Sequence, residues 1–445
     1  MTGPGAIKPR VGVVALAYPG FFLGEEMCAP KREEMLRALR GEAFDVRAYE
    51  GLVLDEKSAR QAGAKLAEER VDCILAVLTT FVPDYFITEL LAGCDAPIFL
   101  WAVEREVRCL SLVCGPMTTA TLYNLGKHYR LAGANIPDAD ALAELRVFAR
   151  GCSLRNALRS MRVGYVGGKC PIMFSMAIDE YALQEKFGTA LVNLPIEELY
   201  DAAKVVPEKE AQDRWSGIQR QVGKVCVSEA DGLLSTRYLL AAERLVEQYG
   251  LNAISINCFP HLKAKVCLAV SCLNDAGVAA ACEGDLHSTL LMQLVSRLTG
   301  QPAFNGDFLR LYSSDNSILF SHCGAGAFGL AGCSKEICLN ASPETQNGLA
   351  VFYATPSAGG VTLCNLIYGR GTLRLAAMRG EGIQADMEYE GTPLRVRFKE
   401  DVRTIVQRVA QRGAGHHWNG GAGDWMKELA LLCELTGIQF NALTE

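Results

Sequence analysis

The sequence is poor in histidine and lacks several motifs that mark common enzyme classes. Six of its 445 residues are histidine. It contains no P-loop, no G-x-S-x-G elbow and no H-E-x-x-H pair. Phosphoryl transfer on a P-loop, hydrolysis by a nucleophilic serine and zinc-dependent proteolysis of the H-E-x-x-H type therefore have no support from motifs.

Long apolar runs and an excess of positive charge are also missing. No run approaches the roughly 20 apolar residues that a membrane helix needs. The first residues lack the basic start and the apolar stretch of a signal peptide. The formal net charge is −6, which gives no basis for electrostatic binding to nucleic acid or to a membrane surface. We therefore expect a cytoplasmic protein that binds neither.

Cysteine is abundant, but its spacing excludes two common uses. The 17 cysteines form no C-x-x-C pair, and most of them lie inside apolar runs. An odd number of scattered cysteines does not fit a disulfide framework or a zinc ribbon. Buried free thiols are the expected state.

The order of apolar runs predicts an α/β fold with two doubly wound domains and a third, β-rich domain. Apolar runs alternate with helical patterns up to about residue 310, as in parallel sheets that are buried on both faces. Short strands between glycine and proline turns then predict an antiparallel barrel-like domain. The expected domains are 1–161, 162–310 and 311–445.

Several individual elements follow from the same patterns. A helix is expected at 118–128, a turn-like stretch at 133–138 and a strand at 232–235. In the last domain, strands are expected at 317–322, 349–354, 361–368, 372–378, 394–398 and 404–409, with no helix before the closing one at 425–435.

The stretch from Ala281 to Asp285 is the first candidate for chemistry. The apolar run 277–282 predicts a buried strand that ends on Glu283, and Asp285 is placed to cap a helix over 286–298 that stops at Gly300. In open α/β folds the chemistry lies at the carboxyl ends of the strands. Glu283 is thus either a site residue or a second capping residue.

Four later residues are candidates for the same site. Asp307 is expected in a turn between apolar residues, and His322 at the end of a strand. His416 and His417 are adjacent in a glycine-rich loop, where imidazoles are rarely needed to fill a core. A G-x-G-x-x-G match begins at Gly324, but no helix pattern and no acidic strand end follow it, so it predicts a turn instead of a dinucleotide site.

Two carboxylates and one or two imidazoles form a plausible set of metal ligands. Mixed oxygen and nitrogen ligands suit Mn²⁺ or a similar ion better than a structural Zn²⁺. A metal that holds two neighbouring sugar oxygens would acidify the adjacent C–H and stabilise an enediolate. The carboxylates could then move a proton between C1 and C2.

Four motifs, taken in order, resemble the L-fucose/L-arabinose isomerase superfamily. They are Cys282-Glu283-Gly284-Asp285 before an apolar helix, Phe304-x-x-Asp307, Phe320-Ser321-His322 and Gly415-His416-His417. The resemblance covers residues 278–440. The N-terminal half is similar only in its general pattern of apolar runs. It implies two α/β domains followed by a domain with a β-barrel, and an aldose–ketose isomerase that works through a cis-enediolate.

The resemblance also implies ligands, partners and roles. Mn²⁺ is the implied metal, with Co²⁺ or Mg²⁺ as alternatives. The implied assembly is a trimer or hexamer in which N-terminal residues of a neighbour reach the site. The implied metal ligands are Glu283, Asp307, His417 and His322, of which Glu283 and Asp307 are also catalytic. The sugar-binding candidates are His416, Trp418 and Phe308.

The sugar itself stays open. The chain combines an aspartate of the fucose type, Asp307, with a histidine of the arabinose type, His322. The expected substrate is a free pentose, hexose or deoxyhexose. The alternatives are a sugar modified at C6, for example by a sulfonate, a non-catalytic sugar-binding or regulatory protein on the same scaffold, and a metal-assisted aldolase or hydrolase.

Overall fold

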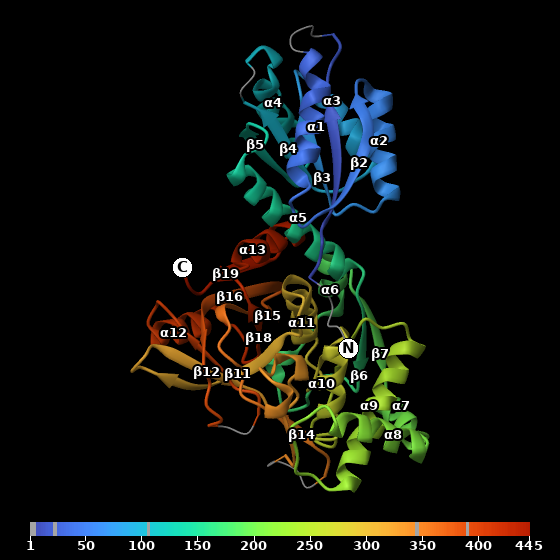
Figure 1. Ribbon diagram of the computed structural model, residues 1–445, viewed down its shortest axis with the longest axis vertical. Coiled ribbons are helices and arrows are strands. Elements are labelled where there is room, and N and C mark those ends of the chain that lie inside the picture. Colours follow the sequence, from blue (N-terminus) through green and yellow to red (C-terminus); the bar gives the residue numbers. More distant parts are fainter. Residues whose placement is uncertain (1–5, 21–24, 105–106, 343–346, 389–390) are drawn as a thin grey trace. The chain divides into compact units, whose positions relative to one another are not determined.

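The computed structural model describes residues 6–20, 25–104, 107–342, 347–388 and 391–445 (Figure 1). The chain divides into two compact units: Ile7–Asn156 forms one, and Ala157–Glu445 with Ala6 forms the other. The expected division into three domains, with boundaries after residues 161 and 310, stays a prediction.

The unit of Ile7–Asn156 is built on a five-stranded parallel sheet. Its strand order is β2-β1-β3-β4-β5, which is one of the common doubly wound orders. The three central strands β1, β3 and β4 are buried and apolar on both faces, as expected for a parallel sheet covered by helices. The strands are β1 Arg10–Leu16, β2 Asp45–Val53, β3 Cys73–Leu78, β4 Ile98–Val103 and β5 Tyr129–Ala134; the helices are α1 Cys28–Leu39, α2 Glu56–Glu68, α3 Asp84–Gly93, α4 Ser111–Asn124 and α5 Ala139–Arg159, the last of which runs on into the other unit.

The larger unit begins with a second parallel sheet, of four strands in the order β10-β9-β6-β7. Its strands are β6 Arg162–Val166, β7 Ala190–Leu194, β9 Ala253–Ile256 and β10 Ala279–Ala281. Its helices are α6 Glu180–Phe187, α7 Ile196–Lys204, α8 Glu208–Gln219, α9 Glu229–Gln248, α10 Cys267–Asp275 and α11 Leu286–Thr299. A small mixed sheet of β8 Lys224–Val225, β13 Cys338–Asn340 and β14 Ala350–Phe352 lies beside it.

The remaining strands form a closed antiparallel barrel. Six strands pair around the ring in the order β15-β18-β11-β12-β17-β16, and β16 pairs back to β15. They are β11 Phe304–Tyr312, β12 Ser317–Ser321, β15 Gly359–Gly369, β16 Thr372–Ile383, β17 Leu394–Arg397 and β18 Trp418–Ala422. A further strand, β19 Gln439–Ala442, pairs with β16 in parallel, and α12 Val402–Arg412 and α13 Met426–Thr436 complete the unit. The expected barrel-like region is therefore confirmed.

Helix α11 connects the parallel sheet to the barrel and packs against both. It contacts β9 and β10 on one side and β15 and β18 on the other. Sequence periodicity predicts one apolar face for it, but polar residues such as His287 and Gln293 are buried as well. A helix placed between two layers is buried all round. Because α11 also packs against the barrel, the acidic turn that precedes it lies next to the barrel.

Two predicted strands are wrong, and the bounds of one predicted helix and one predicted turn differ from the structure. Residues 404–409 lie in α12, which Asp401 caps by accepting from the backbone N–H groups of Arg403 and Thr404. Residues 232–235 lie in α9, which is capped by Ser228. The helix expected at 118–128 spans Ser111–Asn124, and of the turn expected at 133–138 the first two residues belong to strand β5. The two wrong strands are short windows of four to six residues, which fit a helix or a strand equally, and caps decide between them.

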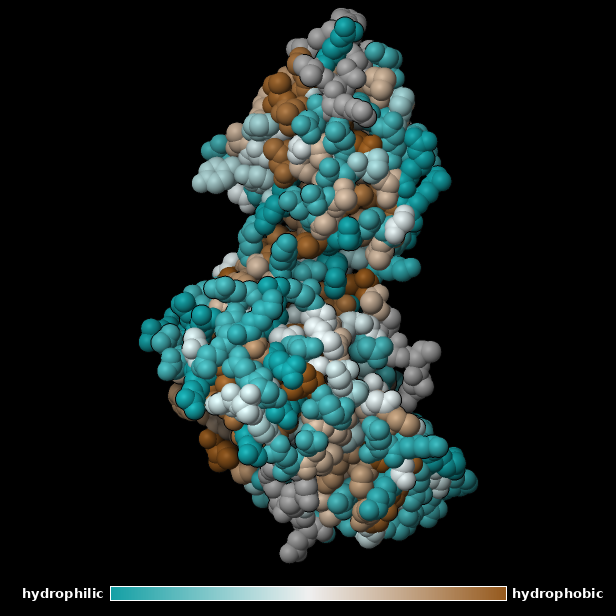
Figure 2. All heavy atoms as spheres, turned by 60° about the vertical axis from the view of Figure 1, so that its left-hand side comes forward, coloured by the Kyte–Doolittle hydropathy of each residue, from teal (hydrophilic) through white to brown (hydrophobic). Residues whose placement is uncertain are grey.

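The surface in view is mostly hydrophilic (Figure 2), and most of the thiols are buried. Figure 2 shows hydrophilic residues spread over the face in view, with hydrophobic ones gathered in small patches. Among the described residues no helix is long and apolar enough to cross a membrane. The cysteines are free, and most of them are buried, as expected.

Candidate metal centre and active site

The local sequence after β10 explains why Glu283 points out of the sheet. Glu283 and Gly284 have φ angles of 62° and 66°, so two successive residues are left-handed. For a residue with a side chain this conformation costs energy and is enriched at functional sites. Hydrogen bonds hold it in place, because Glu283 accepts from the backbone of Cys170 at 2.9 Å and Gly284 donates to Ile256 at 3.1 Å.

Gly284 is needed at this turn for two separate reasons. A Cβ atom there would lie 2.0 Å from the carbonyl oxygen of Gly168, and the positive φ also disfavours any side chain. We expect Gly284→Ala to lower the unfolding temperature by about 5 °C, which corresponds to about 2–3 kcal/mol. Differential scanning calorimetry measures this directly.

Gly250 provides the matched control for that substitution. Its φ is 58°, but a Cβ atom at this position would have no neighbour within 4 Å, so Gly250→Ala carries only the conformational cost of about 1 kcal/mol. If the two alanine variants lose equal stability, the close packing of Gly284 against Gly168 has no energetic weight.

Strand register brings the remaining candidates to one end of the barrel. In β11, Asp307 pairs with Ser321 of β12, so His322 follows directly at the same level. Gly306 pairs with Trp418 of β18, which places His417 there too. The turn predicted at Asp307 is wrong, because this residue lies within strand β11.

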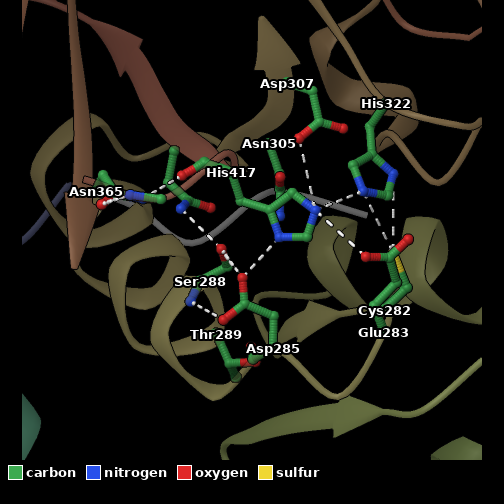
Figure 3. Close-up of polar contacts among 12 residues, drawn as sticks. Cys282, Glu283, Asp285, Ser288, Thr289, Asn305, Asp307, His322, Asn365 and His417 are labelled. Carbon is green, nitrogen blue, oxygen red and sulfur yellow. Dashed lines mark hydrogen bonds and ion pairs between the residues drawn. The ribbon is translucent and has the colours of Figure 1, made fainter. Parts of the chain in front are cut away.

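The side chains of these residues converge on His417 (Figure 3). Its Nε2 atom lies 3.2 Å from Nε2 of His322. The same atom lies 3.4 Å from an oxygen of Glu283 and 3.7 Å from an oxygen of Asp307. Two imidazole nitrogens and two carboxylate oxygens thus face one small volume, although they come from sequence positions as far apart as 283 and 417.

These groups fit a divalent metal ion. The ligand atoms of Asp307, His322 and His417 form one group that could hold an ion, and those of Glu283, His416 and His417 form a second. Oε2 of Glu283, Oδ1 of Asp307 and Nε2 of His416 are buried without a hydrogen-bond partner among the described residues. Buried polar atoms are normally satisfied, and a cation could satisfy those of Glu283 and His416 in one group or that of Asp307 in the other.

Asp285 orients His417 from the opposite side. Its carboxylate accepts from Nδ1 of His417 at 2.7 Å and also caps α11 through the N–H of Ser288 at 3.0 Å. An ionised carboxylate has only acceptors, so Nδ1 carries a proton, and Nε2 would present a lone pair to a metal when the ring is neutral. Such carboxylate–histidine pairs commonly position metal ligands.

The pKa shifts follow from burial and from these contacts. Burial raises the pKa of Glu283, against the opposing effect of His322 and His417. Burial alone would raise the pKa of Asp285, but the hydrogen bond and the charge of His417 hold it well below its usual range. Burial would lower the pKa of His417, and the bond with Asp285 raises it instead. Asp285 therefore stays ionised at any working pH.

Asn365 holds the loop that carries Gly415 and His417, here called the histidine loop. No role for it is predicted from the sequence. Its side chain donates to the carbonyl of His417 at 2.7 Å and accepts from the N–H of Gly415 at 2.8 Å. No motif marks this asparagine, because it lies on β15, far away in sequence. Two thiols also lie close to the site: Cys282 and Cys323 approach Nδ1 of His322 at 3.8 Å and 3.2 Å.

A cavity of about 280 Å³ opens beside these ligands. Its volume is near the lower end of small-molecule sites, which span roughly 300–1,000 Å³. Glu283, Asp307 and His322 line it, together with residues that the sequence did not single out, including Ile172, Lys263 and Ser342.

None of the three sugar-binding candidates is among the residues that line this cavity. Trp418 is completely buried, its ring meets that of Phe308 edge-on at 5.5 Å, and both belong to the barrel core. Side chains alternate along a strand, so Phe308 points away from the face that carries Asp307. The cavity wall contains neither ring. His416 is half-buried and stacks on His417 with a centroid distance of 4.1 Å.

Comparison with known proteins indicates the class of enzyme to which this site belongs. No family model matches the chain. A curated sulfoquinovose isomerase from Priestia aryabhattai is 24% identical over 420 residues, which cover 92% of this chain and 94% of the relative. The sulfoquinovose isomerases of Alkalicoccus urumqiensis and Clostridium sp. (strain MSTE9) are each 25% identical, over 80% and 81% of this chain and 83% of each relative. The chain is an isomerase.

Solved structures give only a weak likeness to this isomerase. An ABC transporter solute-binding protein from Burkholderia multivorans shares 14% identity over 67% of the chain, with a TM-score of 0.19. A score this low carries no argument about the fold.

Proposed function

We propose that this isomerase is a metal-dependent aldose–ketose isomerase of the L-fucose/L-arabinose isomerase superfamily that acts on an aldose with a sulfonate at C6. The convergence of Glu283, Asp307, His322 and His417 on one volume carries the proposal. The names of the relatives support the sulfonated sugar over an unmodified pentose, hexose or deoxyhexose. They also favour an enzyme over a non-catalytic sugar-binding protein.

Glu283, Asp307, His322 and His417 would hold the metal, with Mn²⁺ as the first choice and Co²⁺ or Mg²⁺ as alternatives. When bound, such an ion polarises the sugar carbonyl and stabilises the negative charge that develops on neighbouring oxygens. Asp285 and Asn365 keep His417 in place before any ligand arrives.

The reaction itself is a balanced proton transfer. One proton leaves C2 and one reaches C1, while a proton moves from O2 to O1, so no oxidant or reductant is needed. In our proposal Glu283 and Asp307 serve as base and acid. The Glu283 side chain is 15% exposed, and burial raises the pKa of this carboxylate, which makes it a stronger base.

Turnover in D₂O tests both the reaction and the metal. We expect the isomerase to convert sulfoquinovose to its 2-ketose with deuterium incorporated at C1 or C2, as seen by NMR. Removing divalent ions with a chelator should lower the rate by at least about 100-fold, and Mn²⁺ should restore it.

Three other outcomes would count against this proposal. Equal turnover by metal-stripped protein excludes the metal. Product without solvent deuterium excludes a proton exchanged with water and favours direct hydride transfer. Cleaved products point to an aldolase or hydrolase.

We make three further predictions, about the native metal, the oligomeric state and the location of the protein in the cell. Mn²⁺ is the expected native ion, which metal analysis of protein purified without added metal measures. A trimer or hexamer is the expected assembly, which light scattering measures. The expected location is the cytoplasm, which cell fractionation measures.

A further inference from the structure

Lys263 lies on the wall of the same cavity as the metal ligands. It belongs to the loop between β9 and α10, and the cavity wall includes it together with Glu283, Asp307 and Ser342. Among the cavity-lining residues that the structure describes, Lys263 is the only lysine or arginine. The two carboxylates in that wall are assigned to the metal, so the ammonium group is the remaining permanent charge.

An aromatic contact helps to hold the Lys263 side chain at the cavity. Its Nζ atom lies 4.6 Å from the ring centroid of Phe259, which is itself part of the cavity wall. A cation over an aromatic face is attracted to it. The ring therefore limits the directions that the flexible lysine stem can take.

The backbone next to Lys263 is also fixed. Ala264 has a φ of 61°, a left-handed conformation that a residue with a Cβ adopts only where its surroundings enforce it. Its carbonyl accepts from the N–H of Leu349 at 3.1 Å and from the hydroxyl of Ser235 at 3.4 Å. These contacts come from two other segments, so the loop position is set before substrate binds.

We propose that Lys263 is the residue that selects an anionic group at C6 of the sugar. This inference rests on the proposed isomerase function and adds the source of its substrate specificity. The metal ligands recognise the reacting end of the sugar, and any aldose offers them the same two oxygens. Discrimination must therefore come from the other end of the substrate. An ammonium group with three donors suits a compact oxyanion.

A sulfonate and a phosphate share this anionic chemistry, and the experiment separates them. Steady-state kinetics of the metal-loaded enzyme would compare sulfoquinovose, glucose 6-phosphate and the uncharged 6-deoxyglucose. The variants are Lys263→Met, which keeps the stem, and Lys263→Arg, which keeps the charge. Lys265→Met is the matched control, because Lys265 donates to the carbonyl of His261 at 2.9 Å and does not line the cavity.

We expect Lys263→Met to lower kcat/KM for sulfoquinovose by about 30- to 100-fold, mainly through KM. Its kcat/KM for 6-deoxyglucose should not fall, and its metal content should equal that of the wild type. Lys263→Arg should recover part of the loss, and Lys265→Met should match the wild type. If glucose 6-phosphate is used as well as sulfoquinovose and depends equally on Lys263, the residue selects anions in general.

Other outcomes overturn the inference while leaving the isomerase intact. Equal losses for charged and uncharged sugars would show a structural role for Lys263. A wild-type enzyme that does not prefer the anionic sugar would have no specificity to explain. If no sugar is turned over, the proposed function fails instead, and calorimetric binding of sulfoquinovose to the wild type and to Lys263→Met then decides the inference separately: weaker binding only in the variant supports it, and equal binding overturns it.

Discussion

Replacing Glu283 with glutamine is expected to lower kcat/KM of the isomerase by at least about 10³-fold. The change keeps the shape of the side chain but removes its charge. It therefore removes a proposed metal ligand and a proposed proton carrier together. The left-handed backbone at this residue, and a buried oxygen with no hydrogen-bond partner among the described residues, are the observations behind its proposed role. Kinetics with sulfoquinovose and metal analysis of the purified variant measure the two effects.

Glu247→Gln is the control for the loss of one glutamate charge, because Glu247 lies exposed near the end of α9. It should leave activity and metal content unchanged. The unfolding temperature of metal-free Glu283→Gln should be close to that of the metal-free wild type. A Glu283→Gln enzyme with bound metal and wild-type turnover would falsify the assignment of this residue.

Asp285 combines two roles, and two substitutions should separate them. Asparagine is a good helix cap but carries no charge, so Asp285→Asn should keep most of the stability and weaken metal binding by about 10- to 100-fold through a less well oriented His417. Alanine removes both the cap and the buried bond to His417, and Asp285→Ala should cost about 3 kcal/mol in addition. Calorimetric unfolding and metal titration measure the two quantities.

A second capping aspartate gives the comparison. Asp401 caps α12 at an exposed position and contacts no metal ligand candidate. Asp401→Ala should cost about 1 kcal/mol and leave metal affinity unchanged. If Asp285→Asn binds metal as tightly as the wild type, the bond between Asp285 and His417 serves only the fold.

The candidate site lies where the parallel sheet that contains β10 meets the antiparallel barrel. Glu283 comes from the carboxyl end of a parallel strand, where open α/β folds place ligands. Asp307, His322 and His417 come from one end of an antiparallel barrel, where strand register puts them at one level. Helix α11 packs against both layers, so the cap at its start, Asp285, reaches His417 next to the barrel strand β18.

Local patterns are sufficient for some features and insufficient for others. The apolar run before Glu283 and the spacing from Asp285 to Gly300 predict a strand and a capped helix, and both are present. The window 404–409 has the composition of a strand, although its apolar spacing also fits the helix that forms there. Glycine and asparagine before Asp307 favour a turn, because the pairing partners of β11 are not visible in its own sequence.

The sequence by itself determined which residue types were available for chemistry, and that Glu283 and Asp285 stand between a strand and a capped helix. Runs, caps and rare histidines are local features, and local physics is enough to recognise them. The tertiary structure decided the contacts. Asp285 meets His417 across 132 residues, Asn365 holds the histidine loop, Trp418 enters the core and Lys263 faces the cavity. Such contacts depend on strand register and on packing between layers, and no periodic pattern in the sequence reveals either of them.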